Sequence, residues 1–318
     1  MVKFGYSLST EQLNVKEILD LVVNVENNGF DFAMLSDHFH PWIEKQGQSS
    51  FVWSMLGAVS QKRNSLPVGT GVTATILRYH PAILAQAAAT AAALMEDRFI
   101  FGVGSGENLN EHIIGEGWPP VKVRHEMFRE SLEIIRKLWE GNNTNYFGAY
   151  YTVEDAKIYT LPKTLPPIIV SAYGPKAARI AAELGDGLIT TSPDEEIVKA
   201  YKDNGGDGPM YIQFTVSFDQ NDEKAIDRAY EIWPIAGFND PLNTELRLPK
   251  YYDKVKKMVK KEDIANSIPY GKDPKKYIEQ IQKAIDLGFT HIYLNQVGHE
   301  QKKFMEFYRD EIISNFSR

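Results

Sequence analysis

The chain of 318 residues contains no cysteine. This absence excludes disulfides, thiolate zinc sites and cysteine nucleophiles, and it favours a reducing compartment such as the cytoplasm. Long apolar runs are also missing. The most apolar stretch, Pro81–Met95, is mostly alanine and is shorter than the roughly 20 strongly apolar residues of a membrane span. The first residues lack the pattern of a signal peptide. We therefore expect a cytoplasmic protein with no membrane partner, in which Pro81–Met95 is a buried helix.

An excess of positive charge is absent as well. Lysine and arginine number 35 against 42 aspartate and glutamate residues, which gives a formal net charge of −7. Such a balance argues against binding to nucleic acids or anionic membranes and favours a small-molecule partner. The hydrophobic content of 43% and charged content of 24% are typical of a folded globular protein.

Short apolar runs alternate with helical patterns along the whole chain. The runs that predict strands are Lys3–Leu8, Phe32–Leu35, Pro67–Val72, Arg98–Val103, Pro167–Ser171, Gly187–Thr190, Met210–Ser217 and His291–Asn295. The segments that predict helices are Val15–Asn28, Phe51–Lys62, Pro81–Met95, Arg124–Trp139, Pro175–Leu184, Asp194–Asp203, Pro274–Leu287 and Gln301–Ile313. We expect left-handed caps at the glycines that follow three of these helices: Gly29, Gly185 and Gly288.

Eight such strand–helix units predict a single α/β domain over residues 1–318, a (β/α)8 TIM barrel. An open doubly wound sheet is the alternative, but no Gly-x-Gly-x-x-Gly motif follows the first strand, and Gly102–Gly106 has the wrong spacing. Two segments read as insertions: 142–159, a predicted β-hairpin, and 219–273, a predicted lid or binding wall. The basic run within 254–261 could serve that wall or form the solvated face of a helix.

Polar side chains gather where the predicted strands end, which is where a barrel of this class performs its chemistry. Asp37 and His38 follow the second strand, and Glu107 follows the fourth. Neighbouring side chains diverge, so Asp37 and His38 must serve different partners. An imidazole can take a proton from a substrate hydroxyl, and Glu107 could supply an acid on the opposite side of a pocket. Taken singly, a His or Asp at a strand end is more often a hydrogen-bonded structural residue.

Other chemistries find less support in the pattern. His38 and His40 are two residues apart with no third ligand at a typical spacing, so no metal is expected. Ser105 lacks the Gly-x-Ser-x-Gly elbow of a hydrolase. The segment Gly174–Arg179 begins a helix directly after a strand, and its free amides with Lys176 suit a phosphate, although a plain helix start explains it equally well.

Several motifs together carry a family resemblance along nearly the whole chain. They are Gly5-Tyr6 with Glu11-Gln12, Ser36-Asp37-His38-Phe39-His40-Pro41-Trp42, Arg78-Tyr79-His80-Pro81-Ala82, Gly102-Val103-Gly104-Ser105-Gly106-Glu107-Asn108-Leu109-Asn110-Glu111 and Gly185-Asp186-Gly187. The sequence resembles the coenzyme F420-dependent glucose-6-phosphate dehydrogenase family of the luciferase-like superfamily. Within it, the chain looks most like the F420-dependent secondary alcohol dehydrogenases.

This resemblance implies a site for F420 and a role for each matching residue. It implies that His38 takes the alcohol proton while hydride moves to the deazaflavin C5, and that Glu107 is the acid. Glu11, Trp42 and Thr191 would line the substrate pocket. It also implies a homodimer and a cis peptide bond at Gly71-Val72. The residues implied to contact the cofactor are Asp37, Ala74, Ser105, Gly106, Asn110, Tyr173, Gly174, Lys176 and Ala177.

The chain departs from the sugar-phosphate members where they carry basic residues for the substrate phosphate. A rough comparison puts Asp194, Asn243 and Ser267 at those positions, although Lys250 or Lys254 could supply charge. We therefore expect the oxidation of a neutral alcohol or polyol, or the reduction of the matching carbonyl. The alternatives are a sugar-6-phosphate dehydrogenase, an F420-dependent methylene-pterin reductase, an FMN monooxygenase and a flavin-binding barrel without turnover.

Overall fold

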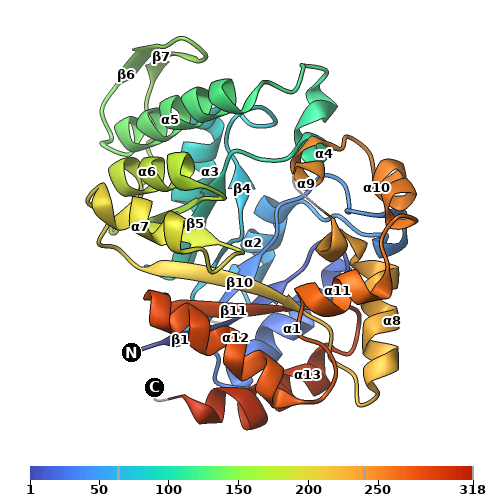
Figure 1. The fold of residues 1–318 in the computed structure, drawn as a ribbon. Coiled ribbons are helices and arrows are strands. Elements are labelled where there is room, and N and C mark those ends of the chain that lie inside the picture. Colours follow the sequence, from blue (N-terminus) through green and yellow to red (C-terminus); the bar gives the residue numbers. More distant parts are fainter. Residues whose placement is uncertain (63–64, 239–240, 317–318) are drawn as a thin grey trace.

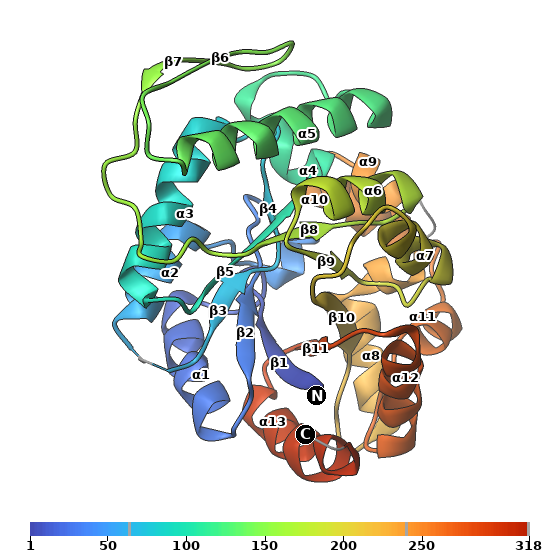
Figure 2. The ribbon, with the colours of Figure 1, turned by 90° about the vertical axis from the view of Figure 1, so that its left-hand side faces the viewer.

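A closed ring of parallel strands forms the centre of the computed structural model, which describes residues 1–62, 65–238 and 241–316. Helices surround the ring on its outside (Figures 1 and 2). The strands follow the order β3-β2-β1-β11-β10-β9-β8-β5-β4, and pairing of β3 with β5 closes the ring. The predicted (β/α)8 barrel is therefore confirmed. Its strands are β1 (Lys3–Leu8), β2 (Phe32–Leu35), β3 (Val68–Thr70), β4 (Thr73–Ala74), β5 (Phe99–Gly104), β8 (Ile168–Ser171), β9 (Gly187–Thr190), β10 (Met210–Val216) and β11 (His291–Gln296).

The third barrel strand differs most from its prediction, whereas the other strands agree within one residue at each end. A continuous strand over Pro67–Val72 is wrong, because β3 ends at Thr70 and the chain resumes as β4. The peptide bond between Gly71 and Val72 is cis, as the family resemblance implies. Both halves pair with β5, so β3 and β4 occupy one strand position of the barrel.

Two glycines allow the third and fourth strand positions to meet. A Cβ atom on Gly69 would lie 2.4 Å from the carbonyl oxygen of Ile100, and one on Gly102 would lie 2.0 Å from that of Thr70. No side chain fits at such distances. Closure of the ring therefore depends on glycine at both positions.

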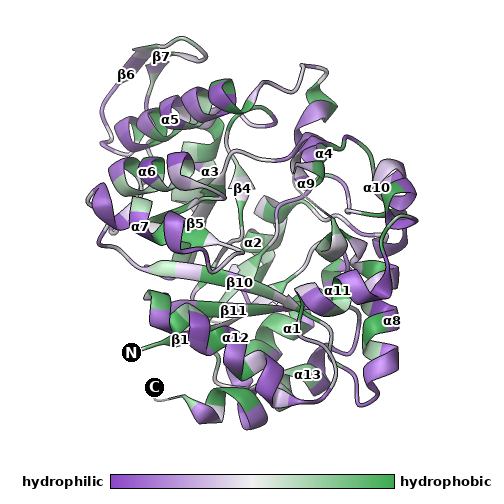
Figure 3. Ribbon diagram, viewed as in Figure 1, coloured by the Kyte–Doolittle hydropathy of each residue, from purple (hydrophilic) through white to green (hydrophobic). Residues whose placement is uncertain are grey.

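The strands carry continuous apolar runs because both of their faces are buried (Figure 3). Outward side chains such as Phe4, Leu35 and Val103 join the core under the helices. Inward side chains fill the barrel as a second cluster: Phe32, Met34, Ile100, Ile169, Ile189, Tyr211 and Tyr293. The barrel interior is therefore a packed core, and only its ends are open to ligands.

The outer helices match most of the predicted segments. They are α1 (Val15–Asn27), α2 (Val52–Ser60), α3 (Pro81–Met95), α5 (Val121–Leu138), α6 (Pro175–Leu184), α7 (Glu195–Asp203), α8 (Asp222–Ile232), α12 (Pro274–Leu287) and α13 (Gln301–Phe307). The last helix was predicted to end at Ile313, and this prediction is wrong. The regular α-helix ends at Phe307, and a π-turn (Tyr308–Ile312) and a 3-10 turn (Ile313–Asn315) follow it. In the part of the chain that is described, no helix has the length and apolar character needed to cross a membrane.

The helix caps confirm two of the three predicted glycines. Gly29 and Gly288 have φ of +72° and +99°, as left-handed caps require. The prediction for Gly185 is wrong, because its φ is −88°. That residue is glycine for a steric reason, since a Cβ would lie 2.6 Å from the carbonyl oxygen of Ala181.

Both predicted insertions are present. The first is a hairpin of β6 (Thr144–Phe147) and β7 (Thr152–Ala156), which lies beyond α5 (Figure 1). The second is 219–273, of which the structure describes all residues except 239–240. It contains α8 and four short helices that pack near the barrel mouth: η3 (Pro234–Gly237), α9 (Leu242–Glu245), α10 (Pro249–Lys256) and α11 (Lys261–Ser267). The mouth also carries η1 (Glu44–Gln46), α4 (Asn108–Glu111) and η2 (His112–Ile114).

One histidine at the amino end of β11 makes the barrel sensitive to acid. His291 stacks on Tyr211 with ring centroids 4.1 Å apart. Burial, with a smaller effect of Lys3, lowers the pKa of His291 from 6.5 to about 4. Between these values the unfolded chain binds a proton that the folded chain does not. The free energy of unfolding must therefore fall as the pH decreases from 6.5 towards 4.

We predict that His291→Phe reduces this acid sensitivity while keeping the stack on Tyr211. Between pH 7.5 and pH 5, the free energy of unfolding should fall by about 2 kcal/mol more in the wild type than in the variant. Urea unfolding at both pH values measures this difference. His299→Gln, at a histidine whose side chain is 67% exposed, serves as the control and should behave as wild type. Equal losses in wild type and His291→Phe would contradict the prediction.

Candidate active site

Loops from four strands meet at the carboxyl ends of the barrel, because all barrel strands run parallel. Glu11 follows β1, His38 follows β2, Ala74 ends β4 and Glu107 follows β5. Residues separated by up to about a hundred positions in sequence are thereby brought to one mouth. The predicted catalytic residues are among those that the fold brings together.

The His38 ring is held on both of its nitrogen atoms. Nε2 lies 3.3 Å from Oε1 of Glu11. Nδ1 lies 3.1 Å from both the carbonyl oxygen of His40 and the side-chain nitrogen of Asn110. The tautomer decides which Nδ1 contact is a hydrogen bond. With the proton on Nδ1, the ring donates to His40 and leaves the Nε2 lone pair free to accept a proton. The ring of Trp42 lies 4.9 Å from that of His38.

The Glu11 carboxylate is buried beneath the His38 ring, with a residue exposure of 2%. Its Oε2 atom accepts hydrogen bonds from the hydroxyl groups of Ser9 (2.7 Å) and Ser36 (2.5 Å). These two bonds leave Oε1 directed at His38. The sequence predicted Glu11 as a lining residue of the substrate pocket, and its pairing with His38 went unpredicted.

Asn110 connects the predicted base and the predicted acid. Its side-chain oxygen accepts the backbone N–H groups of Phe39 (2.9 Å) and His40 (3.1 Å), which fixes the orientation of the amide. Its nitrogen then faces His38 and lies 3.4 Å from Oε2 of Glu107. The resemblance implied a cofactor contact for Asn110. The structure adds a link within the protein that the spacing of residues could not reveal.

A buried group of charges lies beside these residues. The Arg78 guanidinium lies 3.2 Å from Oδ1 of Asp37 and donates to the carbonyl oxygen of Asp37 at 3.1 Å. The backbone N–H of Arg78 donates to Glu111 at 2.8 Å. Asp37 and His38 thus point to different partners, as predicted from their adjacency. One carboxylate oxygen of Asp37, Oδ2, is buried and has no hydrogen-bond partner.

Aromatic side chains from the second insertion pack against Trp42 at the mouth. Tyr252 is fully buried, and its ring lies 5.6 Å from that of Trp42 and 5.9 Å from that of Phe238. Trp233 lies 6.4 Å from Trp42. Burial, and then the nearby charge of Glu107, raises the pKa of Tyr252 far above its ordinary value. We call the four residues Trp42, Trp233, Phe238 and Tyr252 the aromatic wall.

The start of α6 has the properties of an anion site. Its N-cap residue, Gly174, caps no amide with a side chain, and a Cβ there would meet nothing within 4 Å. No side chain of the N-cap residue therefore caps the amides of the first turn, which include those of Lys176 and Ala177, and the neighbouring Tyr173 is 66% exposed. The environment is basic: burial, followed by the charges of Arg124 and Lys176, lowers the pKa of His125. A phosphate fits this position.

The remaining predicted contacts lie on the loop after β5 and at the end of β4. Gly106 has φ of +74°, and a Cβ there would lie 2.8 Å from that of Ala74. Ser105 and Gly106 therefore form a turn that packs tightly on Ala74. This turn, the Asp37 oxygen without a partner and the α6 start are features that a planar ligand with a phosphate-bearing tail would need.

None of the residues at the positions where sugar-phosphate members have basic residues is itself basic. Thr191 follows β9 on the exposed surface, and Asp194 caps α7 by accepting the N–H of Glu196 at 2.7 Å. Asn243 lies in α9, and Ser267 ends α11 and donates to Asp263. Two lysines raised as substitutes, Lys250 and Lys254, lie over the ring of Tyr251 at 5.5 and 5.7 Å.

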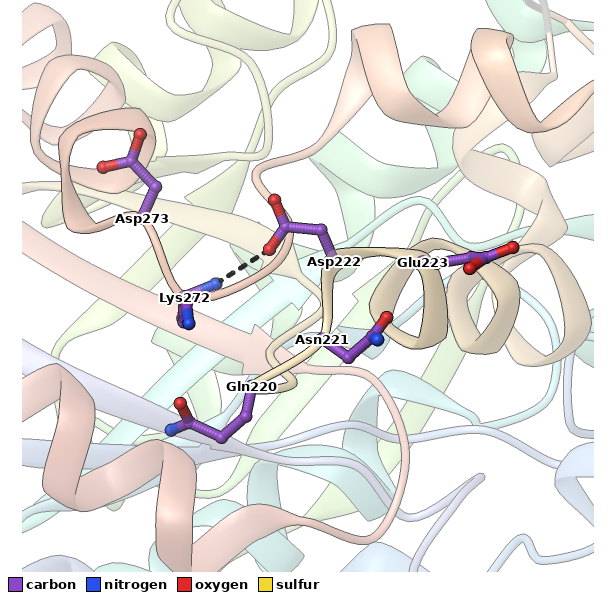
Figure 4. A pocket seen from close by; sticks show the side chains of 6 residues that line it. All are labelled: Gln220, Asn221, Asp222, Glu223, Lys272 and Asp273. Carbon is purple, nitrogen blue, oxygen red and sulfur yellow. Dashed lines mark hydrogen bonds between the residues drawn. The ribbon is translucent and has the colours of Figure 1, made fainter.

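A surface hollow of about 650 Å³ is lined by none of the predicted site residues (Figure 4). All its lining residues are exposed, and three are carboxylates, so it offers little shelter for an anion or a planar ligand. Its lining residues are Gln220, Asn221, Asp222, Glu223, Lys272 and Asp273. In residues 1–62, 65–238 and 241–316, no three His, Asp or Glu side chains come together as metal ligands.

Comparison with known proteins shows the family and the fold. The model of the luciferase-like monooxygenase family matches residues 2–291. The F420-dependent glucose-6-phosphate dehydrogenase of Microbacterium testaceum is 33% identical, over 98% of this chain and 96% of that protein. An F420-dependent secondary alcohol dehydrogenase, solved with an F420–acetone adduct, superposes with a TM-score of 0.91 at 28% identity, covering 99% of both chains. The F420-dependent tetrahydromethanopterin reductase of Methanopyrus kandleri shares the fold, with a TM-score of 0.80 at 20% identity over 99% of both chains.

The aromatic wall depends on a single buried hydroxyl. Tyr252 donates to the carbonyl oxygens of Asn243 (3.0 Å) and Leu246 (3.2 Å), which ties α10 to α9. We predict that Tyr252→Phe lowers the free energy of local opening of α9 by about 1–2 kcal/mol, because two partly buried carbonyls lose their donor. Hydrogen–deuterium exchange of residues 242–256 should then accelerate. The control is Tyr251→Phe, at the partly exposed neighbour, which should exchange as wild type; identical exchange in both variants would refute the role of Tyr252.

Proposed function

The chain belongs to the luciferase-like monooxygenase family, and we propose that it is an F420-dependent oxidoreductase. It transfers a hydride between the CH–OH group of a neutral alcohol or polyol and the deazaflavin of F420. One observation carries this proposal: His38 is held between Glu11 and Asn110 at the barrel mouth, next to Glu107 and under an aromatic wall. The relatives named as F420-dependent dehydrogenases support the cofactor and the CH–OH donor.

F420 supplies a deazaflavin carbon that accepts hydride from the alcohol. Asp37 would accept a hydrogen bond from the cofactor through its unpaired oxygen. Ala74, Ser105, Gly106 and Asn110 would line its ring. The start of α6 would hold the phosphate and the neighbouring linker, through Tyr173, Gly174, Lys176 and Ala177.

His38 takes the hydroxyl proton of the substrate at Nε2. The Glu11 carboxylate, 3.3 Å from that atom, stabilises the positive charge of the ring once the proton has arrived. Glu107, joined to His38 through Asn110, is the acid that serves the cofactor side of the mouth. Both roles need water to be excluded, and the aromatic wall provides that exclusion.

The substrate is neutral because of what lines its pocket. Glu11, Trp42 and Thr191 line the pocket, and the aromatic wall extends the apolar surface around Trp42. A phosphate group loses its hydration on binding and needs several cations to compensate, and Asp194 would repel it. A sugar-6-phosphate dehydrogenase is the second candidate, which the names of the curated relatives favour. A methylene-pterin reductase would have no use for a hydroxyl base such as His38.

The proposal extends to assembly and compartment. We expect one barrel domain per chain and a homodimer in the cytoplasm. The family resemblance supports the homodimer, and the absence of cysteine supports a reducing compartment. Light scattering after size exclusion measures the assembly directly.

We predict that F420 with small neutral secondary alcohols or polyols gives a higher kcat/KM than with any sugar phosphate. Each missing charged hydrogen bond to a phosphate is worth about 1.5–3 kcal/mol. The binding of glucose 6-phosphate should therefore be at least about 10²-fold weaker than in a site with such partners. Loss of the deazaflavin absorbance across both panels measures this. A micromolar KM for a sugar phosphate would establish the second candidate, and FMN binding as tight as F420 would favour a flavin monooxygenase.

We predict that His38→Asn lowers kcat about 10²-fold or more and leaves F420 affinity nearly intact, because loss of a base acts on the chemical step. Glu107→Gln should also slow turnover with F420 still bound. His112→Asn is the matched control, since the ring of this histidine stacks on His40 and its Nδ1 bonds to the carbonyl oxygen of Asn108; its turnover should stay within about 2-fold of wild type. Normal turnover by His38→Asn would rule out His38 as the base.

A further inference from the structure

Arg78 joins three of the loops that form the mouth. Its guanidinium contacts Asp37 after β2, and its backbone N–H donates to Glu111 in α4. The Arg78 and Glu111 side chains also form an ion pair, with Nε and Oε1 3.4 Å apart. The side-chain exposures are 6% for Arg78 and 0% for both carboxylates, so this group of three charges is withdrawn from solvent. Burying three charges is costly unless they are mutually paired.

The pairing leaves one oxygen without a partner. Oδ1 of Asp37 contacts Arg78 at 3.2 Å and accepts the hydroxyl of Tyr79 at 3.3 Å. Oδ2 of Asp37 is buried and makes no hydrogen bond in the structure. An unsatisfied buried carboxylate oxygen costs free energy that a bound hydrogen-bond donor would recover.

Glu111 lies directly beneath the turn at Gly106. A Cβ on Gly106 would lie 2.9 Å from Cγ of Glu111, so the two residues are in close contact. The carboxylate of Glu111 therefore connects the turn after β5 with the loop that carries Arg78. Displacing either partner would move Asp37 and Gly106 together.

We infer that Arg78 is a positioning residue for the cofactor, which holds Asp37 so that its free oxygen meets a hydrogen-bond donor of F420, and that a charged Glu111 weakens this hold by competing for Arg78. This inference rests on the proposed function. Neither residue touches the ligand in this account. They act through Asp37 and the Gly106 turn.

The charge of Glu111 gives this arrangement a measurable signature. Burial is the main cause that raises the pKa of Glu111 to about 7, and Arg78 opposes it. The charged or titratable groups that act on Glu111, or that Glu111 acts on, are Arg78, Asp37, Glu107, Tyr79 and Tyr151. Below pH 7 a protonated Glu111 leaves Arg78 to Asp37 alone. Above pH 7 two carboxylates compete for one guanidinium, and the group carries a net charge of −1.

The first experiment is a fluorescence titration of F420 into wild type and Glu111→Gln between pH 6 and pH 8, without substrate. The ratio of the two dissociation constants cancels the titration of F420 itself. The ratio should be near one at pH 6. At pH 8 wild type should bind F420 several-fold more weakly than Glu111→Gln, with a ceiling of about 10-fold. At saturating F420, kcat should change by less than about 2-fold.

Glu130→Gln is the matched control for a buried carboxylate. Glu130 is 8% exposed and accepts backbone N–H groups of the hairpin, including those of Ala149 and Tyr151. Its removal affects packing but should leave the pH dependence of F420 affinity as in wild type. A shift of equal size in Glu130→Gln would mean that the effect of Glu111→Gln is a general loss of stability.

The second experiment tests action through Asp37 by a double-mutant cycle. Arg78→Lys keeps the charge and loses the two-point contact, and it should weaken F420 binding about 10-fold. Combined with Asp37→Asn, it should weaken binding no further than Asp37→Asn alone. Additive losses would overturn the inference. So would equal affinities of wild type and Glu111→Gln across the pH range, whereas failure of wild type to bind F420 would instead overturn the proposed function.

Discussion

The close contact of the third and fourth strand positions is the constraint on which the rest of the molecule depends. Gly69 and Gly102 let the two backbones meet where any Cβ would collide with a carbonyl oxygen. This contact closes a sheet that would otherwise keep two free edges. Closure sets every strand end on one ring, so Glu11, His38 and Glu107 converge although no local motif joins them.

Most of the fold could be predicted because burial on both faces leaves a plain signal in the sequence. The strands at Lys3–Leu8, Phe32–Leu35 and Gly187–Thr190 have the predicted bounds, as do the helices α3, α6 and α12. The failures have steric causes. The third strand breaks at Gly71, where the apolar run continues, and Gly185 is required by a nearby carbonyl although its φ is negative. Hydrophobic patterns do not report such contacts.

The site was predictable in its residue types and less so in its contacts. The position of a residue after a strand predicts which mouth it reaches, and this identified His38 and Glu107. It does not predict rotamers, so the pairing of Glu11 with His38 and the link through Asn110 appear only in three dimensions. Tyr252 was missed for another reason. An aromatic residue in a short amphipathic helix has the same pattern whether it packs in a core or covers a substrate.

Chemistry and specificity therefore belong to different parts of the chain. The loops after β1, β2 and β5 carry Glu11, His38 and Glu107, the proposed acid–base groups, and they are tied to one another by partly buried hydrogen bonds and an ion pair. The aromatic wall comes mainly from the insertion after β10, where Tyr252 secures α9 through two backbone carbonyls. A change in this insertion can exchange an apolar surface for cations while His38 stays in place, since Trp42 lies between the His38 ring and that of Tyr252. A barrel of this kind can thus keep one hydride-transfer chemistry while the preference for neutral or phosphorylated alcohols changes with a single segment.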